Sequence, residues 1–196
     1  EVIVPDITWV ATANAVLYVG ATPIFADVDA ETWCIDPVSV ESLITPRTKA
    51  IIPVHLYGQP SDMDAIMLLA ERHKLFVVED AAPSIGAECK GRRTGSFGHF
   101  SAFSFQGAKL AVTGEGGMLV TNDEALFKRA YTIWDQGRTP GTFWIETNGF
   151  KYKMSNIQAA IGVAQLTRIN SLVERKRNIL EQYKAHFCDI PTLSMN

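Results

Sequence analysis

The feature that most constrains the fold is the alternation of short apolar runs with longer segments of helical periodicity. Six runs are rich in β-branched or aromatic residues and are bounded by Gly, Pro, Asp or Thr, as buried strands are. Alternation of such strands with helices is typical of an α/β domain with a mainly parallel sheet. The expected strands are Val2–Val4, Pro23–Ala26, Ala50–Val54, Phe76–Glu79, Phe100–Phe105 and Met118–Thr121.

Helices are expected between these strands and after the last of them. Asp36 and Pro37 supply a cap and a first-turn proline for a helix over Val38–Leu43. From Ser155 onward the apolar positions keep a helical period, which predicts one long or bent helix running towards His186. The other expected helices are Thr12–Val19, Met63–His73 and Asp123–Trp134.

Composition excludes several classes of protein. The 196 residues are 47% hydrophobic and 20% charged, enough for one substantial core, and the net charge of −3 offers no basic surface for nucleic acid or an anionic membrane. No apolar run reaches the roughly 18 residues of a membrane span. The three cysteines have no paired spacing, so we expect neither a metal site nor a disulfide framework, and a reducing cytoplasm fits best.

Two strand ends carry unusual residues, and ligands of parallel sheets lie beyond such ends. One apolar strand runs directly into Glu79 and Asp80; a helix cap or turn aspartate is the ordinary explanation for such a carboxylate. Another strand ends at Ser104, followed by a small-residue turn, Lys109 and the glycine-rich segment 114–117. A lone lysine is usually a solvated surface residue. Together, however, an amine, a carboxylate and a hydroxyl are the parts that pyridoxal 5'-phosphate (PLP) chemistry requires.

The chain resembles the DegT/StrS sugar aminotransferases, a branch of the fold type I PLP enzymes, and is most similar to their perosamine synthase group. The resemblance implies a three-layer α/β/α fold with a mainly parallel sheet, the large PLP-binding domain. Residues 1–154 would form the core of that domain, and residues 155–196 would lead towards a small C-terminal domain. The matching segments are 8–14, 20–23, 53–58, 79–82, 95–98, 104–109, 114–117 and 154–160.

The resemblance implies a role for each matching residue. Lys109 occupies the position of the lysine that forms the Schiff base with PLP, and Ser104 that of the serine that contacts the phosphate. Asp80 matches the aspartate that pairs with the ring nitrogen and keeps it cationic, so that the ring accepts electrons. Trp9 matches the aromatic residue that stacks on the ring, with an ordinary core tryptophan as the alternative. Ala82 is also expected to contact the cofactor.

Three positions depart from the family's pattern. Pro83 stands where many relatives carry a polar side chain that reaches the cofactor's phenolic oxygen, which proline cannot do. Gln106 replaces the histidine or tyrosine common in relatives, so the substrate end of the site is less defined. Lys151 stands where an asparagine commonly reaches the phosphate in the neighbouring subunit; lysine could act there by charge, or be an ordinary exposed lysine. His55 is expected to be a hydrogen-bonded core or turn histidine.

The resemblance implies a reaction that moves an amino group from glutamate to a keto sugar, with a nucleotide-linked 4-keto-6-deoxy sugar as the expected acceptor. Lys109 would serve as the proton shuttle once the amino donor displaces it. The implied assembly is a homodimer with shared sites. Family members are nearly twice this length, and the first residues read like the interior of a protein, so we expect the chain to be a partial sequence.

Three alternatives remain open. A sugar dehydratase of the same family would carry histidine in place of Lys109. A catalytically silent relative would have no physical need for Asp80, Ser104 and Lys109 together. A dinucleotide-binding domain would carry a Gly-x-Gly-x-x-Gly turn after its first strand, whereas the glycines at 114, 116 and 117 precede an expected strand.

Overall fold

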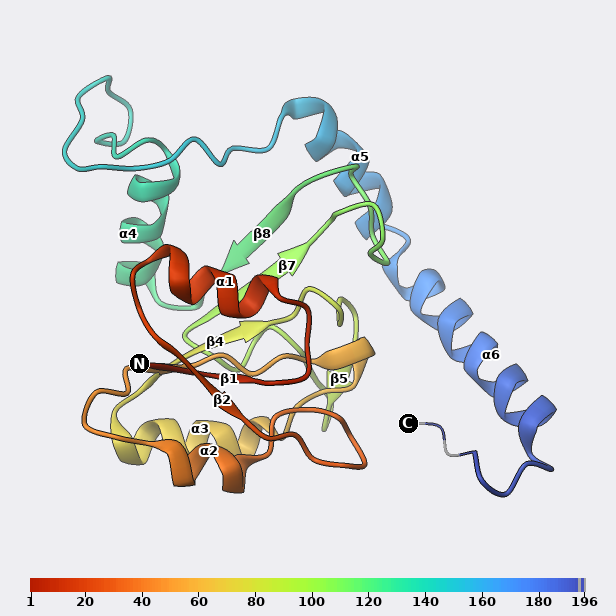
Figure 1. Ribbon diagram of the computed structural model, residues 1–196. Coiled ribbons are helices and arrows are strands. Elements are labelled where there is room, and N and C mark those ends of the chain that lie inside the picture. Colours follow the sequence, from red (N-terminus) through yellow and green to blue (C-terminus); the bar gives the residue numbers. More distant parts are fainter. Residues whose placement is uncertain (194, 196) are drawn as a thin grey trace.

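The fold is built on a six-stranded sheet with the strand order β2-β1-β3-β4-β7-β8 (Figure 1). The computed structural model describes residues 1–193 and 195. Five neighbouring strands are parallel, and β8 is antiparallel to β7. The strands are β1 (Val2–Pro5), β2 (Pro23–Ala26), β3 (Ala50–Ile51), β4 (Phe76–Asp80), β7 (Phe100–Ser104) and β8 (Gly117–Val120); β5 (Glu88–Cys89) and β6 (Arg92–Arg93) form a separate hairpin.

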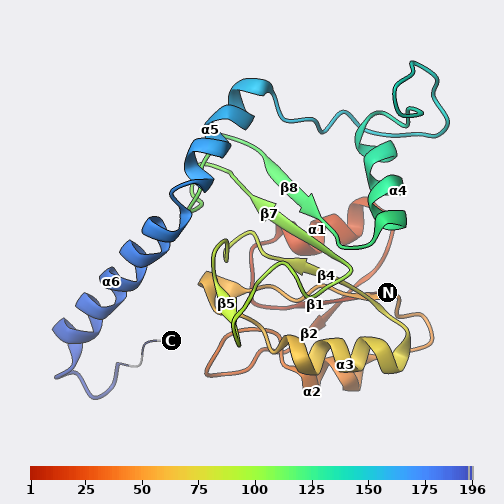
Figure 2. The ribbon, with the colours of Figure 1, turned by 180° about the vertical axis from the view of Figure 1, so that it is seen from behind.

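Helices cover both faces of the sheet, which confirms the expected three-layer α/β/α arrangement. Figures 1 and 2 show α1 (Ala11–Tyr18) on one face and the pair α2 (Pro37–Leu43) and α3 (Met63–His73) on the other. The remaining helical elements are the 3-10 turn η1 (Leu56–Gly58), α4 (Glu124–Trp134), α5 (Asn156–Leu166) and α6 (Ile169–Phe187).

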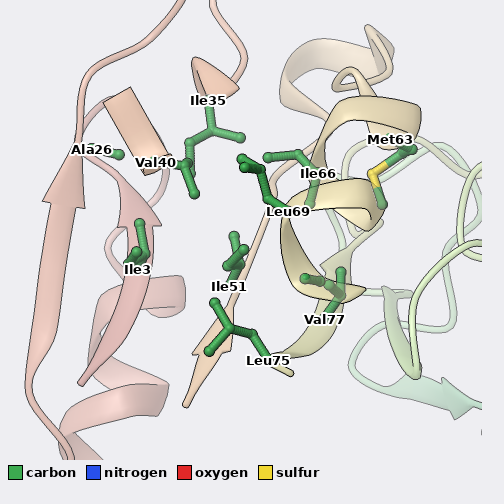
Figure 3. Packing of buried hydrophobic residues seen from close by; sticks show 11 residues of the cluster. Ile3, Ala26, Ile35, Val40, Ile51, Met63, Ile66, Leu69, Leu75 and Val77 are labelled. Atoms are coloured by element: carbon green, nitrogen blue, oxygen red, sulfur yellow. The ribbon is translucent and has the colours of Figure 1, made fainter. Parts of the chain in front are cut away.

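The main core lies between the sheet and the α2–α3 pair (Figure 3). Central strands contribute Ile3, Ile51 and Val77, and α3 contributes Ile66 and Leu69. These side chains are buried, and a fully buried residue of this size contributes roughly 1.5–3 kcal/mol to folding. This layer therefore packs the α2–α3 pair against the central strands of the sheet.

Local chemistry explains where the elements begin and end. The carboxylates of Asp36, Asp62 and Asp123 each accept a backbone N–H from the first turn of α2, α3 and α4. The strand expected over 50–54 is shorter, because Pro53 has no N–H to donate; Val54 then pairs with Asp80 in a single bridge.

The long helix expected from Ser155 is two helices. Ser155 and Gln158 form a reciprocal capping box at the start of α5. The break falls at Thr167 and Arg168, where the Thr167 hydroxyl donates to the carbonyl of Ala164 at 2.9 Å. Arg168, with φ −105° and ψ 5°, leaves the helical conformation at this point. The second helix, α6, then runs away from the sheet (Figures 1 and 2).

Candidate functional site

Asp80 is the last residue of β4, and two separate elements hold its carboxylate. Oδ1 accepts the backbone N–H of Ala82 at 3.1 Å, which is the contact expected of an ordinary turn aspartate. In addition, Oδ2 accepts the hydroxyl of Thr12, in the first turn of α1, at 2.7 Å. A carboxylate has about four lone-pair positions, so this one can accept further hydrogen bonds.

The strand next to β4 is β7, which ends at Ser104; Lys109 follows in the turn after it. Asp80 is paired with Ala102, and Ser104 lies two residues further along the same strand. The chain then turns: the Gln106 carbonyl accepts the N–H of Lys109 at 2.9 Å. Because neighbouring parallel strands end at the same edge of a sheet, Asp80, Ser104 and the turn that carries Lys109 share one edge.

Helix α5 supports the loop that follows Lys109. The side-chain amide of Gln158 donates to the carbonyl of Glu115 at 2.9 Å, and Thr113 donates its hydroxyl to the same carbonyl at 2.8 Å. A Cβ added at Gly162 of α5 would meet the Thr113 methyl group at 3.2 Å, so a glycine there allows close packing. The loop that follows Lys109 is thus held in place by α5.

Trp9 lies between β1 and α1 and is 76% exposed. It is therefore not a core tryptophan in this chain, and its indole is available to stack on a ligand. Its carbonyl accepts the N–H of Thr12 at 3.3 Å, so Trp9 is connected to the residue that holds Asp80. Ala82 is partly buried and touches Asp80 through its N–H.

Lys151 is not brought to this edge within the chain. It lies beyond the end of α4 and pairs with Asp135 in an isolated antiparallel bridge. No hydrogen bond or ion pair joins it to Asp80, Ser104 or Lys109 in the part of the chain that the structure describes. Its expected action on a neighbouring subunit stays a prediction.

The other acid at the end of β4, Glu79, belongs to a buried structural network. Its carboxylate accepts the His55 ring N–H, the N–H groups of Gly95, Phe97 and Gly98, and the Ser101 hydroxyl, all within 3.0 Å. Burial alone would raise the pKa of Glu79, but these hydrogen bonds outweigh it and lower the pKa below its usual value. The expectation for His55, a hydrogen-bonded core histidine, agrees with this geometry.

Thr12 is the contact residue that sequence reasoning missed. The matching segment 8–14 includes Thr12 but implies no role for it. A signal was present in the spacing, because an expected helix over 12–19 places Thr12 and Val16 one turn apart on the same face; the structure buries both. A hydroxyl on such a face needs a hydrogen-bond partner, and the structure supplies Asp80.

The model of the DegT/DnrJ/EryC1/StrS aminotransferase family matches residues 1–196. The chain belongs to this family. Several members of the DegT/DnrJ/EryC1/StrS family are similar over nearly the whole chain. GDP-perosamine synthase of Caulobacter vibrioides is 49% identical over 185 residues, which cover 94% of this chain and 50% of that protein.

Solved structures of relatives share the same fold. S. venezuelae DesV, determined with a ketimine intermediate, has a TM-score of 0.93 at 39% identity, covering 97% of this chain and 52% of that one. A Streptococcus pneumoniae protein described as a sugar aminotransferase, determined in its PLP form, has a TM-score of 0.89 at 32% identity, covering 96% and 54%. The chain spans about half the length of the curated relatives it matches.

Two features are absent from residues 1–193 and 195. No helix there is both long and apolar enough to cross a membrane. No group of three or more His, Cys, Asp or Glu side chains in that part is arranged to hold a metal ion.

Proposed function

We propose that the protein containing this chain is a PLP-dependent aminotransferase that moves an amino group from glutamate to a nucleotide-linked 4-keto-6-deoxy sugar. The observation that carries the proposal is the placement of Asp80, Ser104 and Lys109 at one edge of the sheet, with Trp9 exposed beside α1. Similarity to GDP-perosamine synthases makes a GDP-linked mannose derivative the first choice of substrate.

The donor set fits PLP. Asp80 has a fixed carboxylate with unused lone pairs, which suits a protonated ring nitrogen. Lys109 makes no side-chain hydrogen bond or ion pair among the described residues, so its amine is available. The Ser104 hydroxyl accepts the N–H of Gln106 at 3.4 Å and keeps its own proton for a phosphate oxygen.

Each residue then has a defined task. Asp80 would keep the ring nitrogen protonated, Ser104 would donate to the phosphate, and Trp9 would cover one ring face and exclude water. Lys109 would hold the cofactor and afterwards take the α-proton of the amino donor at Nζ. When bound, PLP supplies the electron sink and carries the amino group between the two substrates. Lys109 disfavours dehydration, for which the family uses histidine at this position.

Exposed apolar side chains support a homodimer. They lie on the segment between α4 and α5 and along α5. In a dimer, this surface would be buried and Lys151 would reach the partner's phosphate site. The exposed apolar residues of this surface are Phe143, Trp144, Ile145, Phe150, Tyr152, Ile157 and Val163.

The cysteines are all free thiols, which supports a cytoplasmic location.

The proposal is tested with protein from the complete reading frame that contains this chain. It is supplied with PLP, glutamate and a panel of GDP-, UDP- and dTDP-linked 4-keto-6-deoxy sugars beside a keto-cyclitol, and release of 2-oxoglutarate is followed. We expect amination of the GDP-linked sugar. Amination of the cyclitol alone would overturn the nucleotide-sugar assignment, and the neutral side chain of Gln106 makes this comparison necessary. No release with any acceptor would overturn the aminotransferase itself.

A further inference from the structure

The contact between Thr12 and Asp80 joins two parts of the candidate site that are 68 residues apart in sequence. Thr12 is only 5% exposed, and its hydroxyl donates to Oδ2 of Asp80 at 2.7 Å. The other carboxylate oxygen, Oδ1, accepts the N–H of Ala82. Each oxygen therefore has one donor, and the two donors come from different elements.

Two donors of this kind fix the plane of the carboxylate. The Ala82 contact alone is a local turn bond within one short segment, which leaves the carboxyl group free to rotate about χ2, a broad and soft torsion. The Thr12 hydroxyl belongs to a different element, α1, and so removes that freedom. A hydrogen bond to an ionised carboxylate is short and about twice as strong as a neutral one.

The same contact also fixes the position of Trp9. Thr12 is in the first turn of α1, and its N–H donates to the carbonyl of Trp9 at 3.3 Å. The next contact, from the N–H of Asn14 to the carbonyl of Val10, continues this turn. A shift of Thr12 away from Asp80 would therefore move the segment that carries the indole. The ring-nitrogen carboxylate and the ring-stacking aromatic residue are linked through one hydroxyl.

We propose that Thr12 is a positioning residue. Its hydroxyl orients the carboxylate of Asp80 for the cofactor's ring nitrogen, and it thereby holds Trp9 in a fixed position relative to Asp80. Thr12 itself touches no reacting atom and acts through Asp80. The inference rests on the proposed function, in which Asp80 faces that nitrogen. It predicts that loss of the hydroxyl weakens cofactor binding only while Asp80 is present.

The test compares Thr12→Val, which keeps the shape and removes the hydroxyl, with Thr12→Ser, which keeps the hydroxyl. Protein from the complete reading frame is titrated with PLP, and the visible spectrum of the bound cofactor is recorded against pH. We expect Thr12→Val to bind PLP about tenfold more weakly and to shift the pH midpoint of the spectrum, and Thr12→Ser to stay within about twofold of the wild type. A purely structural role would not move that midpoint.

A double-mutant cycle with Asp80→Ala separates the inference from the proposed function. If Thr12 acts through Asp80, Thr12→Val causes no further loss of affinity in the Asp80→Ala background. Wild-type affinity in Thr12→Val, with clear loss in Asp80→Ala, would overturn the inference and leave the proposed function standing. Equal weakening in Thr12→Val and Thr12→Ser would also overturn it. Wild-type affinity in Asp80→Ala would overturn the role of Asp80 and the inference with it.

Discussion

The imidazole of His55 and the carboxylate of Glu79 are both fully buried, and His55 Nε2 lies 3.0 Å from Glu79 Oε2. The other ring nitrogen, Nδ1, accepts the N–H of Ser61 at 3.1 Å. A nitrogen that accepts carries no proton, so this hydrogen-bond network assigns a neutral ring with its proton on Nε2. Glu79 is therefore a buried anion held by neutral donors, directly beside the candidate catalytic residue Asp80.

We predict that Glu79→Gln lowers the free energy of unfolding by roughly 3 kcal/mol, because the amide group of Gln would face backbone N–H donors that it cannot satisfy. Urea denaturation of the two proteins at pH 7 measures this. The matched control is Glu31→Gln, at an exposed position, which should change stability by less than about 0.5 kcal/mol. A loss equal to that of the control would show that the buried network contributes little.

The lowered pKa of Glu79 also predicts how the stability of the protein depends on pH. The folded-state pKa of Glu79 lies below its usual value of 4.5, so the folded protein binds the proton less readily than the unfolded chain. Its contribution is therefore complete above about pH 4.5 and is lost as the pH falls through the folded-state pKa. The stability difference between wild type and Glu79→Gln should shrink as urea denaturation is repeated at lower pH. A difference constant from pH 7 to pH 3 would contradict the assigned ionisation.

We predict that Lys109 is the lysine that bonds to PLP. Incubation with PLP, borohydride reduction and peptide mapping should place the pyridoxyl label on the peptide containing Lys109, and Lys109→Ala should abolish it. Lys128→Ala is the control, since Lys128 lies on α4 and pairs with Glu124 at 2.7 Å. A label retained in Lys109→Ala would assign the bond to another lysine.

We predict that Asp80→Asn reduces transamination by about 100- to 1,000-fold, because it removes the charge that keeps the ring nitrogen protonated. The fold should persist, since the amide has the same size. Single-turnover rates with glutamate measure the effect, and circular dichroism checks the fold. Asp64→Asn, an exposed aspartate on α3, is the control and should retain the wild-type rate. Full activity in Asp80→Asn would mean that another group does this work.

We predict that Ile157→Glu weakens the proposed dimer, because the charge would be buried without a partner. The dissociation constant, measured by sedimentation, should rise at least about tenfold. Val38→Glu is the matched control: Ile157 is 76% exposed on α5 and Val38 is 75% exposed on α2. Equal effects of the two substitutions, or a wild-type monomer that binds PLP tightly, would contradict a dimer with shared sites.

The sequence by itself was sufficient to predict the alternation of strands and helices and to identify the family. Apolar periodicity is a local property, so the boundaries of α3 were predicted at the residues where they occur. The matched segments around Asp80 and Lys109 identified the family, and the roles expected of these two residues stay predictions. Local pattern was insufficient where a single residue interrupts an element, as Pro53 does after β3 and Arg168 does between α5 and α6.

Only the tertiary structure decided how neighbouring residues divide their tasks. Glu79 and Asp80 are adjacent acids, but successive residues of a strand point to opposite faces of a sheet. Glu79 is therefore enclosed by five donors, whereas Asp80 meets Thr12 and keeps lone pairs for a ligand. The position of Thr12 opposite Asp80 depends on how α1 packs across the sheet, a long-range relationship that no local sequence pattern encodes.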